Sequence, residues 1–289
     1  MKKHFLFLAA ASVIAFAYKP LQAEVVKVVE NEPKGVLLPS KLKTEAAGFD
    51  AYAAGLYRQI DFTGAERMDA DVFKKALSGY LNLKAAQKLG SQQNVLTVCD
   101  FSLPSSEKRM WIIDMDRKKV LLNELVAHGQ GSGDVMATAF SNTNNSHQSS
   151  LGFYVTGETY TGQHGTSLRL HGQDKGYNDA ALARGIVVHG ANYVNKAYAA
   201  ANKRIGRSWG CPAVDQAISQ KVINYIKGGS CMFIYANHKP YLQAGYWVNK
   251  KVENMPTENI FAEQHAKTQI AGITTHTDSV QTAVAAGQL

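Results

Sequence analysis

The sequence predicts an α+β protein in which most of the chain is β-structure. Two segments with helical periodicity come first, many short apolar and β-branched segments follow, and one amphipathic helix comes late. Helices and strands that are segregated along a chain favour α+β or mostly-β architecture over alternating βαβ units. With 289 residues, 45% of them hydrophobic, the chain can bury a sizeable core, whereas three cysteines are too few for a disulfide-built scaffold.

The amino terminus has the pattern of an export signal. Lys2 and Lys3 precede an apolar run over residues 5–17, and small residues follow up to Ala23. A membrane-spanning helix needs about 18 apolar residues, so we expect residues 1–23 to be a cleaved signal peptide, with no stable membrane insertion afterwards. Removal of its three lysines lowers the net charge of +8 to +5, which suits an anionic polymer. Without a basic run, no nucleic-acid partner is expected.

Residues 24–92 are expected to form a linker and a helical segment. The linker, residues 24–44, is polar and contains two prolines. A first helix is predicted over residues 45–60, and a second begins near Asp69 or Asp71 and ends before Gly90. Both carry apolar stripes that need a partner surface. The stripe residues are Phe49, Tyr52, Ala53, Leu56 and Tyr57 in the first helix and Phe73, Leu77 and Tyr80 in the second.

Residues 93–250 are expected to form the main domain, and residues 251–289 a polar, flexible tail. Residues 129–150 form a long segment rich in glycine, serine and asparagine, which predicts a functional surface loop. A helix is predicted to be capped by Asp215, to turn Ile218, Val222, Ile223 and Ile226 inward, and to end at residues 228–229. Strands are predicted over residues 95–101, 109–115, 120–127, 151–156, 168–171, 185–189 and 231–235, with a polar turn at 116–119.

A cysteine in an unusual setting is the first candidate for chemistry. Cys211 lies between Gly210 and a proline, so it has open access for a carbonyl and a fixed backbone. Arg204 and Arg207 precede it and would favour the thiolate or hold a substrate carboxylate. The alternative is a buried structural cysteine in a tight turn. Cys99 and Cys231 lie in strand patterns and are expected in the core, although an oxidising compartment would allow them to pair.

A histidine supplies the second half of this candidate. His189 ends the apolar strand 185–189 and is followed by Gly190, which gives the backbone freedom beside the imidazole. A lone histidine in such a place is more often structural, but the cysteine cluster favours a Cys–His pair. His171, also at a strand end before a glycine, is the rival base. We favour His189, because its strand is more apolar.

These motifs resemble a known family. The strand-His-Gly pattern followed by Arg-Ser-Trp-Gly-Cys-Pro-Ala resembles the YkuD-type L,D-transpeptidase catalytic domain, and more closely its divergent branch of murein L,D-transpeptidases, common in Gram-negative bacteria. The resemblance runs from about residue 70 to 236 and includes the hairpin of residues 109–129, which ends in Val-Ala-His-Gly. It implies a mostly-β L,D-transpeptidase-like catalytic domain behind the helical segment, a periplasmic location and no cofactor.

By this resemblance, Cys211 attacks the third residue of a peptidoglycan stem tetrapeptide and releases the terminal D-alanine. An amine of a neighbouring stem then gives a 3→3 crosslink, or water gives an L,D-carboxypeptidase. His189 is the implied base, the Gly210 and Cys211 amides form the oxyanion hole, Ser208 orients the imidazole and Arg207 binds a carboxylate. Further residues expected at the substrate are Trp209, His171, Tyr160, Gly190 and, with them in the donor cleft, His164. The alternative for His171, His164 and Tyr160 is that they only satisfy polar groups in a loop-rich wall, and this structural role is favoured for Tyr160.

Two departures and two other readings stay open. The family's usual second histidine and the residue two after the cysteine are replaced by Trp209 and Ala213, and Trp209 is expected to form an apolar wall. A zinc endopeptidase would need ligands such as His164, His171, Asp174 and His189, but their spacing matches no compact ligand motif, so no metal is expected. A non-catalytic wall-binding protein with this fold is the remaining alternative.

Overall fold

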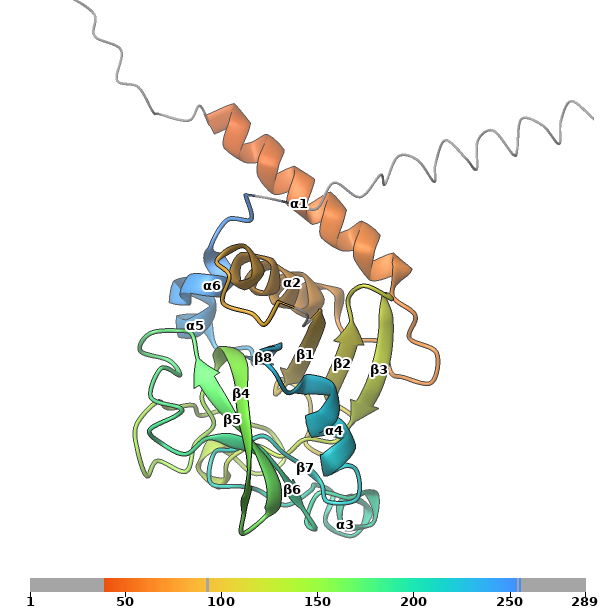
Figure 1. Ribbon diagram of the computed structural model, residues 1–289, viewed down its shortest axis with the longest axis vertical. Coiled ribbons are helices and arrows are strands. Elements are labelled where there is room, and N and C mark those ends of the chain that lie inside the picture. The colour runs from red at the N-terminus through yellow and green to blue at the C-terminus, as the bar shows by residue number, and fades with distance from the viewer. Residues whose placement is uncertain (1–38, 92–93, 254, 256–289) are drawn as a thin grey trace, which may run out of the picture. The chain divides into compact units, whose positions relative to one another are not determined.

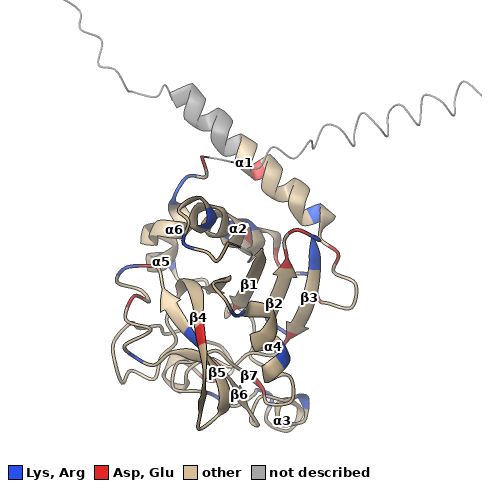
Figure 2. Cartoon of the chain, viewed as in Figure 1, with Lys and Arg blue, Asp and Glu red and all other residues tan. Residues whose placement is uncertain are grey.

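The computed structural model describes residues 39–91, 94–253 and 255, and the side chains of its first helix from Gly48 onward. The expected signal peptide, most of the linker and nearly all of the expected tail lie outside the described residues. The fold is α+β with a predominance of strands, as the sequence predicts (Figure 1). No helix in the described part of the chain is long and apolar enough to cross a membrane. Residues of opposite charge are interspersed over the elements in the view of Figure 2.

One eight-stranded sheet organises the fold, in the order β3-β2-β1-β8-β4-β5-β6-β7. The β1–β8 and β6–β7 pairs are parallel, and the other neighbouring pairs are antiparallel. The strands are β1 (Val95–Asp100), β2 (Met110–Asp114), β3 (Lys119–Glu124), β4 (Gly152–Gly162), β5 (Gly165–Gly172), β6 (Val187–Ala191), β7 (Ala213–Asp215) and β8 (Cys231–Tyr235). The seven predicted strands are confirmed, whereas β7 was not predicted.

The two early helices are also confirmed. Helix α1 spans Pro39–Gln59, and α2 spans Ala70–Ala85. The start of the first helix was predicted wrongly, because residues 39–44, expected in the linker, belong to α1. The Asp69 carboxylate accepts the amides of Asp71 and Val72 at 2.8 and 3.0 Å, which satisfies backbone donors at the start of α2.

Helix α2 packs on β1 and β8, so the helical segment shares the core of the sheet. A Cβ on Gly79 would lie 2.1 Å from the Phe153 ring, and that ring stacks on Phe233 at 4.2 Å. Only a residue without a side chain permits this approach of helix to sheet. Beyond β8, α5 (Lys239–Ala244) and α6 (Tyr246–Asn249) follow. The Lys250 carbonyl accepts the Asn82 amide at 2.8 Å, which ties this end to α2.

The prediction for the late helix is partly wrong. Helix α4 spans Ser219–Ile226 and has no side-chain cap. Asp215 instead ends β7, and its carboxylate accepts the Ala217 amide at 2.9 Å in the turn before the helix. The apolar face was predicted correctly in Val222, Ile223 and Ile226, which are fully buried. A further helix, α3 (Lys196–Asn202), lies between β6 and β7 and was not predicted.

Candidate active site

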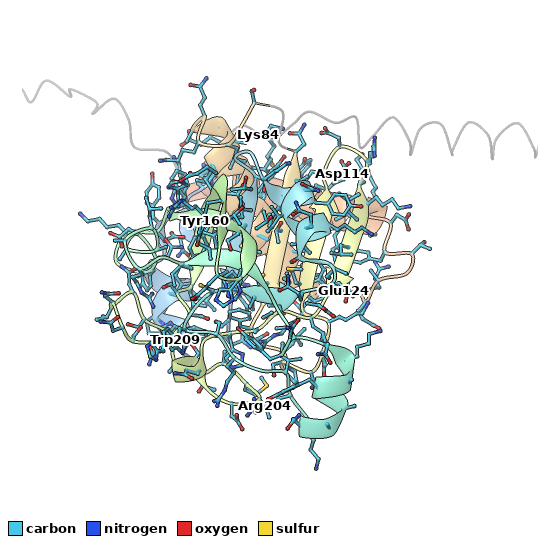
Figure 3. All side chains as sticks on the ribbon, turned by 60° about the horizontal axis from the view of Figure 1, so that its bottom comes forward. Lys84, Asp114, Glu124, Tyr160, Arg204 and Trp209 are labelled. Carbon is cyan, nitrogen blue, oxygen red and sulfur yellow. The ribbon has the colours of Figure 1, made fainter. Side chains whose placement is uncertain are left out.

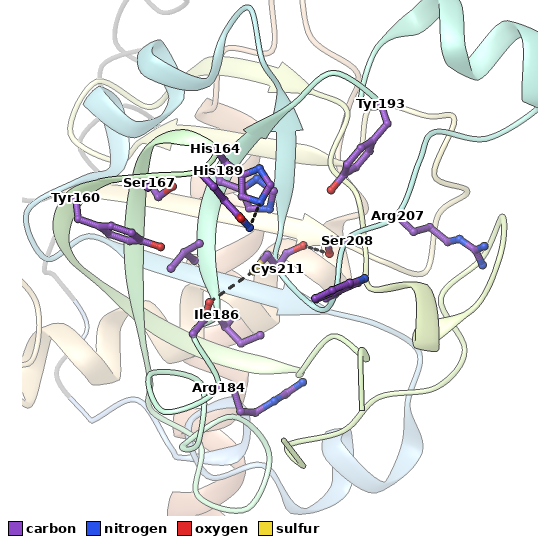
Figure 4. Close-up of a pocket in the computed structure, with 15 residues that line it drawn as sticks. Tyr160, His164, Ser167, Arg184, Ile186, His189, Tyr193, Arg207, Ser208 and Cys211 are labelled. Atoms are coloured by element: carbon purple, nitrogen blue, oxygen red, sulfur yellow. Dashed lines mark hydrogen bonds between the residues drawn. The ribbon is translucent and has the colours of Figure 1, made fainter. Parts of the chain in front are cut away.

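A cavity of about 620 Å³ contains most of the candidate residues (Figure 4). Its walls come from the turn between β4 and β5, the start of β6, the segment after β6 and the segment before β7. It is lined by Tyr160, Gly162, Gln163, His164, Ser167, Arg184, Gly185, Ile186, Val187, His189, Tyr193, Arg207, Ser208, Trp209 and Cys211. The cavity therefore joins segments that are distant in sequence.

Parallel pairing of β6 with β7 brings the predicted base near the predicted nucleophile. His189 pairs with Ala213 in this register, so Cys211 precedes the partner of His189 by two positions. The thiol Sγ lies 3.8 Å from the Gly185 carbonyl oxygen, to which it donates. In Figure 4 Cys211 lies between the two imidazoles above and Arg184 below.

The imidazole of His189 is held in one tautomer. Its Nδ1 lies 2.9 Å from the Gly190 carbonyl oxygen. Because a carbonyl only accepts, Nδ1 carries the proton and Nε2 keeps its lone pair. Burial lowers the pKa of His189, the Gly190 carbonyl opposes that shift, and the nearby His164 adds to it. The ring is thus neutral at neutral pH and suited to accept a proton through Nε2.

The thiol is also held in its neutral form. Burial raises the pKa of Cys211, while the Val187 amide and the Arg184 charge oppose that rise. A raised thiol pKa beside a lowered imidazole pKa favours a neutral pair over a preformed thiolate–imidazolium pair. Proton transfer to the imidazole would then accompany attack by sulfur rather than precede it.

Ser208 organises the turn that carries the cysteine. Its hydroxyl donates to the Cys211 carbonyl at 2.6 Å and accepts the Gly210 amide at 3.1 Å. The imidazole partner is Gly190, so Ser208 does not make the contact that the resemblance implies. The Gly210 amide is likewise occupied, whereas the Cys211 amide has no acceptor among the described residues.

The end of the Val-Ala-His-Gly hairpin supports this turn from behind. The Ser208 amide donates to the His128 carbonyl at 3.0 Å, and the Gln130 amide donates to the Ser208 carbonyl at 2.8 Å. A Cβ on Gly129 would lie 2.9 Å from the Gly210 Cα, and Gly210 itself has φ +121°. Both glycines are therefore needed where the two segments meet.

A buried arginine and histidine lie beneath the same hairpin end. Arg109 is fully buried, donates twice to the Val126 carbonyl and donates from Nη2 to His128 Nδ1 at 2.8 Å. Burial and the Arg109 charge lower the pKa of His128 to about 4. His128 is therefore a neutral acceptor. Nothing in the sequence beyond the hairpin motif predicts this pair.

The two arginines before the cysteine share one carboxylate. Arg204 lies 2.8 Å from Asp134 Oδ1, and Arg207 lies 3.4 Å from the same oxygen. Arg207 also donates to the Gly133 carbonyl at 2.8 Å. Only Arg207 of the two lines the cavity. Arg184, which no sequence motif predicts as a site residue, is the arginine whose charge acts on Cys211.

Trp209 forms an exposed aromatic surface at the cavity. It is 71% exposed and stacks on His147, with ring centroids 4.9 Å apart and planes 7° apart. Gln130 lies within hydrogen-bond distance of the His147 ring, 3.0 Å from Nδ1. In Figure 3 Trp209 lies toward the end of the molecule that carries Arg204. The stacking of His147 on Trp209 was not predicted from the sequence.

The remaining candidates fall into two groups. Tyr160 and His164 line the cavity, and the Arg169 guanidinium lies 4.7 Å from the Tyr160 ring centroid. His171 does not line it; its Nε2 lies 3.7 Å from Glu158 on the hairpin. Gly190 does not line it either, and it contributes its carbonyl to His189.

No metal centre or disulfide occurs in the described residues. No group of three or more His, Cys, Asp or Glu side chains there lies close enough to hold a metal ion. Cys99 and Cys231 are free and fully buried. They lie on paired strands but out of register, since Cys231 pairs with Leu96 and Cys99 with Ile234.

Comparison with known proteins gives one family. A family model described as the L,D-transpeptidase catalytic domain matches residues 64–235, more than half of the chain. A search of curated proteins found no match.

Three solved structures are similar. An L,D-transpeptidase from Mycobacterium smegmatis is 12% identical, with 50% of this chain and 59% of that chain covered and a TM-score of 0.32. LD transpeptidase LdtMt1 in complex with imipenem is 10% identical, with 49% and 59% covered and a TM-score of 0.31. The L,D-transpeptidase (Yku) from Stackebrandtia nassauensis is 13% identical, with 66% and 91% covered and a TM-score of 0.30. The chain thus spans 59% of the length of each of the first two.

Proposed function

The chain belongs to the L,D-transpeptidase catalytic domain family, a family of peptidoglycan-modifying enzymes, and we propose that it is a periplasmic cysteine acyltransferase that forms 3→3 crosslinks. The observation that carries the proposal is that His189, on β6, and Cys211, two residues before the parallel partner strand β7, line one cavity. The substrate is a stem tetrapeptide of peptidoglycan.

Acylation uses the neutral pair described above. His189 Nε2 takes the thiol proton while Cys211 Sγ attacks the carbonyl carbon of the third stem residue. The bond to the terminal D-alanine then breaks, and His189 returns its proton to the leaving amine. The product is a thioester on Cys211 and free D-alanine.

Deacylation completes the transfer. An amine of a neighbouring stem attacks the thioester carbon, His189 takes the amine proton, and the thiol is released. The Cys211 amide, which has no acceptor among the described residues, is the donor available to a developing oxyanion. The Gly210 amide joins it only if the Ser208 hydroxyl moves away, because that hydroxyl occupies it at 3.1 Å.

The substrate groups are assigned to the cavity walls. Arg207 binds a stem carboxylate beside the Asp134 carboxylate that it already faces at 3.4 Å. Trp209 supplies an apolar face, and Tyr160 and His164 supply wall residues from the β4–β5 hairpin. His171 is left as a residue of the hairpin surface.

The test is incubation of the mature protein with disaccharide-tetrapeptide muropeptides, with products identified by mass. A crosslinked dimer that disappears in Cys211→Ala and His189→Ala supports the proposal. Cys99→Ala is the matched control, because Cys99 is fully buried in β1. Tripeptide and free alanine without dimer would make the enzyme a carboxypeptidase. Unchanged muropeptides with retained binding to sacculi would favour a wall-binding protein.

A further inference from the structure

Arg184 is a cavity residue whose hydrogen bonds all go to neutral acceptors. Its Nη1 donates to the Ser141 carbonyl at 2.7 Å and to the Ser150 hydroxyl at 2.5 Å. Its Nη2 donates to the Ser146 hydroxyl at 3.1 Å and to the Gln148 carbonyl at 2.8 Å. These four bonds fasten the loop of residues 141–150 to the entrance of β6.

The charge of Arg184 is not compensated by a carboxylate. No Asp or Glu within the described ranges lies within ion-pair distance of its guanidinium, and its four acceptors carry only partial charges. Arg204 and Arg207 differ, because both face Asp134. A positive charge that is partly removed from water and unpaired acts more strongly on its neighbours than a paired one.

Arg184 lies beside the segment that carries the thiol. A Cβ on Gly210 would lie 3.5 Å from Arg184 Nη2 and 2.8 Å from the Gln148 carbonyl oxygen that Arg184 holds. The next residue, Gly185, accepts the thiol of Cys211. The Arg184 guanidinium thus lies beside Gly210 of the nucleophile segment, and Arg184 directly precedes the residue that accepts the thiol.

Other titratable groups face the same cavity from every element around it. They are His189 on β6, His164 and Tyr160 from the β4–β5 hairpin, Tyr193 after β6, and Arg207 on the nucleophile segment. The His189 imidazole is neutral when it acts as the base, and Arg207 has Asp134 as its counterion. Among these described groups, Arg184 is the cation without a counterion.

We propose that Arg184 is a positioning residue that stabilises the Cys211 thiolate through its unpaired charge. The proposal rests on the role of Cys211 as nucleophile. Burial opposes ionisation of this thiol, and the Arg184 charge favours it. Arg184 also holds the loop of residues 141–150, against which Gly210 packs. One side chain thus supplies both a positive charge near the thiol and a support for the segment that carries it.

The experiment measures alkylation of Cys211 by iodoacetamide as a function of pH, with the modified residue located by mass. Cys99 and Cys231 are fully buried and do not compete in the folded protein. In Arg184→Met the midpoint of the pH profile rises by about one unit relative to wild type. Arg184→Lys keeps the charge and stays near wild type. Arg204→Met is the matched control and leaves the midpoint in place.

A second pair of variants keeps Arg184 and adds a counterion, in case Arg184→Met does not fold. Ser146→Asp places a carboxylate on Nη2 and raises the midpoint, whereas Thr143→Asp adds the same charge to the same loop without that contact and does not. Equal midpoints in these two variants, or in Arg184→Met and wild type, would overturn the proposal. A shift in Arg184→Lys as large as in Arg184→Met would also overturn it.

Failure of this inference is distinguishable from failure of the proposed function. Alkylation needs no substrate. An enzyme inactive on muropeptides whose thiol still depends on Arg184 would refute the acyl-transfer proposal and leave the inference standing. An active enzyme whose thiol profile ignores Arg184 would do the reverse.

Discussion

The imidazoles of His164 and His189 lie ring on ring, with centroids 4.3 Å apart and planes 24° apart. His189 comes from β6, and His164 reaches it from the turn between β4 and β5. Two imidazoles in this arrangement cannot both be protonated without repulsion, so His164 disfavours the charged form of His189. The stack therefore helps to keep His189 available as a base.

Replacing His164 with phenylalanine keeps an aromatic ring stacked on His189 but removes the electrostatic effect of the His164 imidazole. Because His164 lowers the pKa of His189, the variant raises that pKa, and the acidic limb of the kcat/KM profile moves to higher pH. The measurement is kcat/KM against pH. His171→Phe is the control, since His171 pairs with Glu158 outside the cavity. An acidic limb that is the same in both variants would contradict the prediction.

The stability of the protein should depend on pH through His128. The pKa of His128 is about 4 in the folded state, below the ordinary histidine value of 6.5 that applies in the unfolded chain, so the unfolded chain binds the proton more tightly. Its contribution, about 3 kcal/mol, is fully present above pH 6.5 and is lost as pH falls toward 4. Urea unfolding at pH 7 and pH 5 measures it. In His128→Gln, which cannot titrate, the loss between these pH values is smaller; an equal loss in both proteins would exclude His128 as the cause.

Gly129→Ala should destabilise the protein and inactivate it together. The added Cβ would meet the His147 carbonyl oxygen at 2.3 Å and Gly210 at 2.9 Å, and backbone on both sides cannot yield cheaply. We expect a loss of about 2–4 kcal/mol in the free energy of unfolding. Gly176→Ala is the comparison, because it has no atom within 4 Å and only the strain of φ +82°; that strain costs about 1 kcal/mol. Thermal unfolding of both variants measures these losses. Equal losses of stability in Gly129→Ala and Gly176→Ala would show that Gly129 is not tightly packed against His147 and Gly210.

Trp209 gives a spectroscopic report of substrate binding. Trp111 and Trp247 are 1% and 6% exposed, whereas Trp209 is 71% exposed. Adding a tetrapeptide muropeptide to Cys211→Ala, which cannot turn it over, should shift the tryptophan emission to shorter wavelength. Trp209→Phe removes the shift and raises KM in the active enzyme by roughly tenfold, as loss of an aromatic contact implies. An unchanged shift in Trp209→Phe would place the substrate elsewhere.

The strands could be predicted from the sequence because the buried strands of the sheet consist of short runs of apolar and β-branched residues. Strand β8, for example, has five consecutive buried positions and was predicted at its true bounds. Strand β7 has three residues and helices α5 and α6 are short, so their sequences carry too little periodicity to stand out. Asp215 was predicted to cap the late helix, but whether an aspartate carboxylate caps a helix or closes the preceding turn depends on where the helix starts, and α4 starts at Ser219.

The cavity residues that could be predicted from the sequence are those that lie within or next to a recognisable motif. Ser208, Trp209 and Cys211 share one segment, and His189 ends an apolar strand. Arg184 and His147 became visible only through contacts with distant segments, such as the stack of His147 on Trp209. Such contacts follow from sheet pairing and loop packing, which a single sequence does not specify.

Because β6 and β7 pair in parallel, the length of the excursion between them, the segment of residues 192–210, does not determine how far His189 lies from Cys211. Residues 192–210 leave the sheet, form α3 and return, yet the separation of His189 from Cys211 is set by the register of the two strands. Insertions or deletions in the part of this excursion that carries α3 can therefore change the number of residues between base and nucleophile without moving either. Relatives of this chain should be recognised by which residue pairs with the histidine across the sheet, rather than by counting residues from histidine to cysteine.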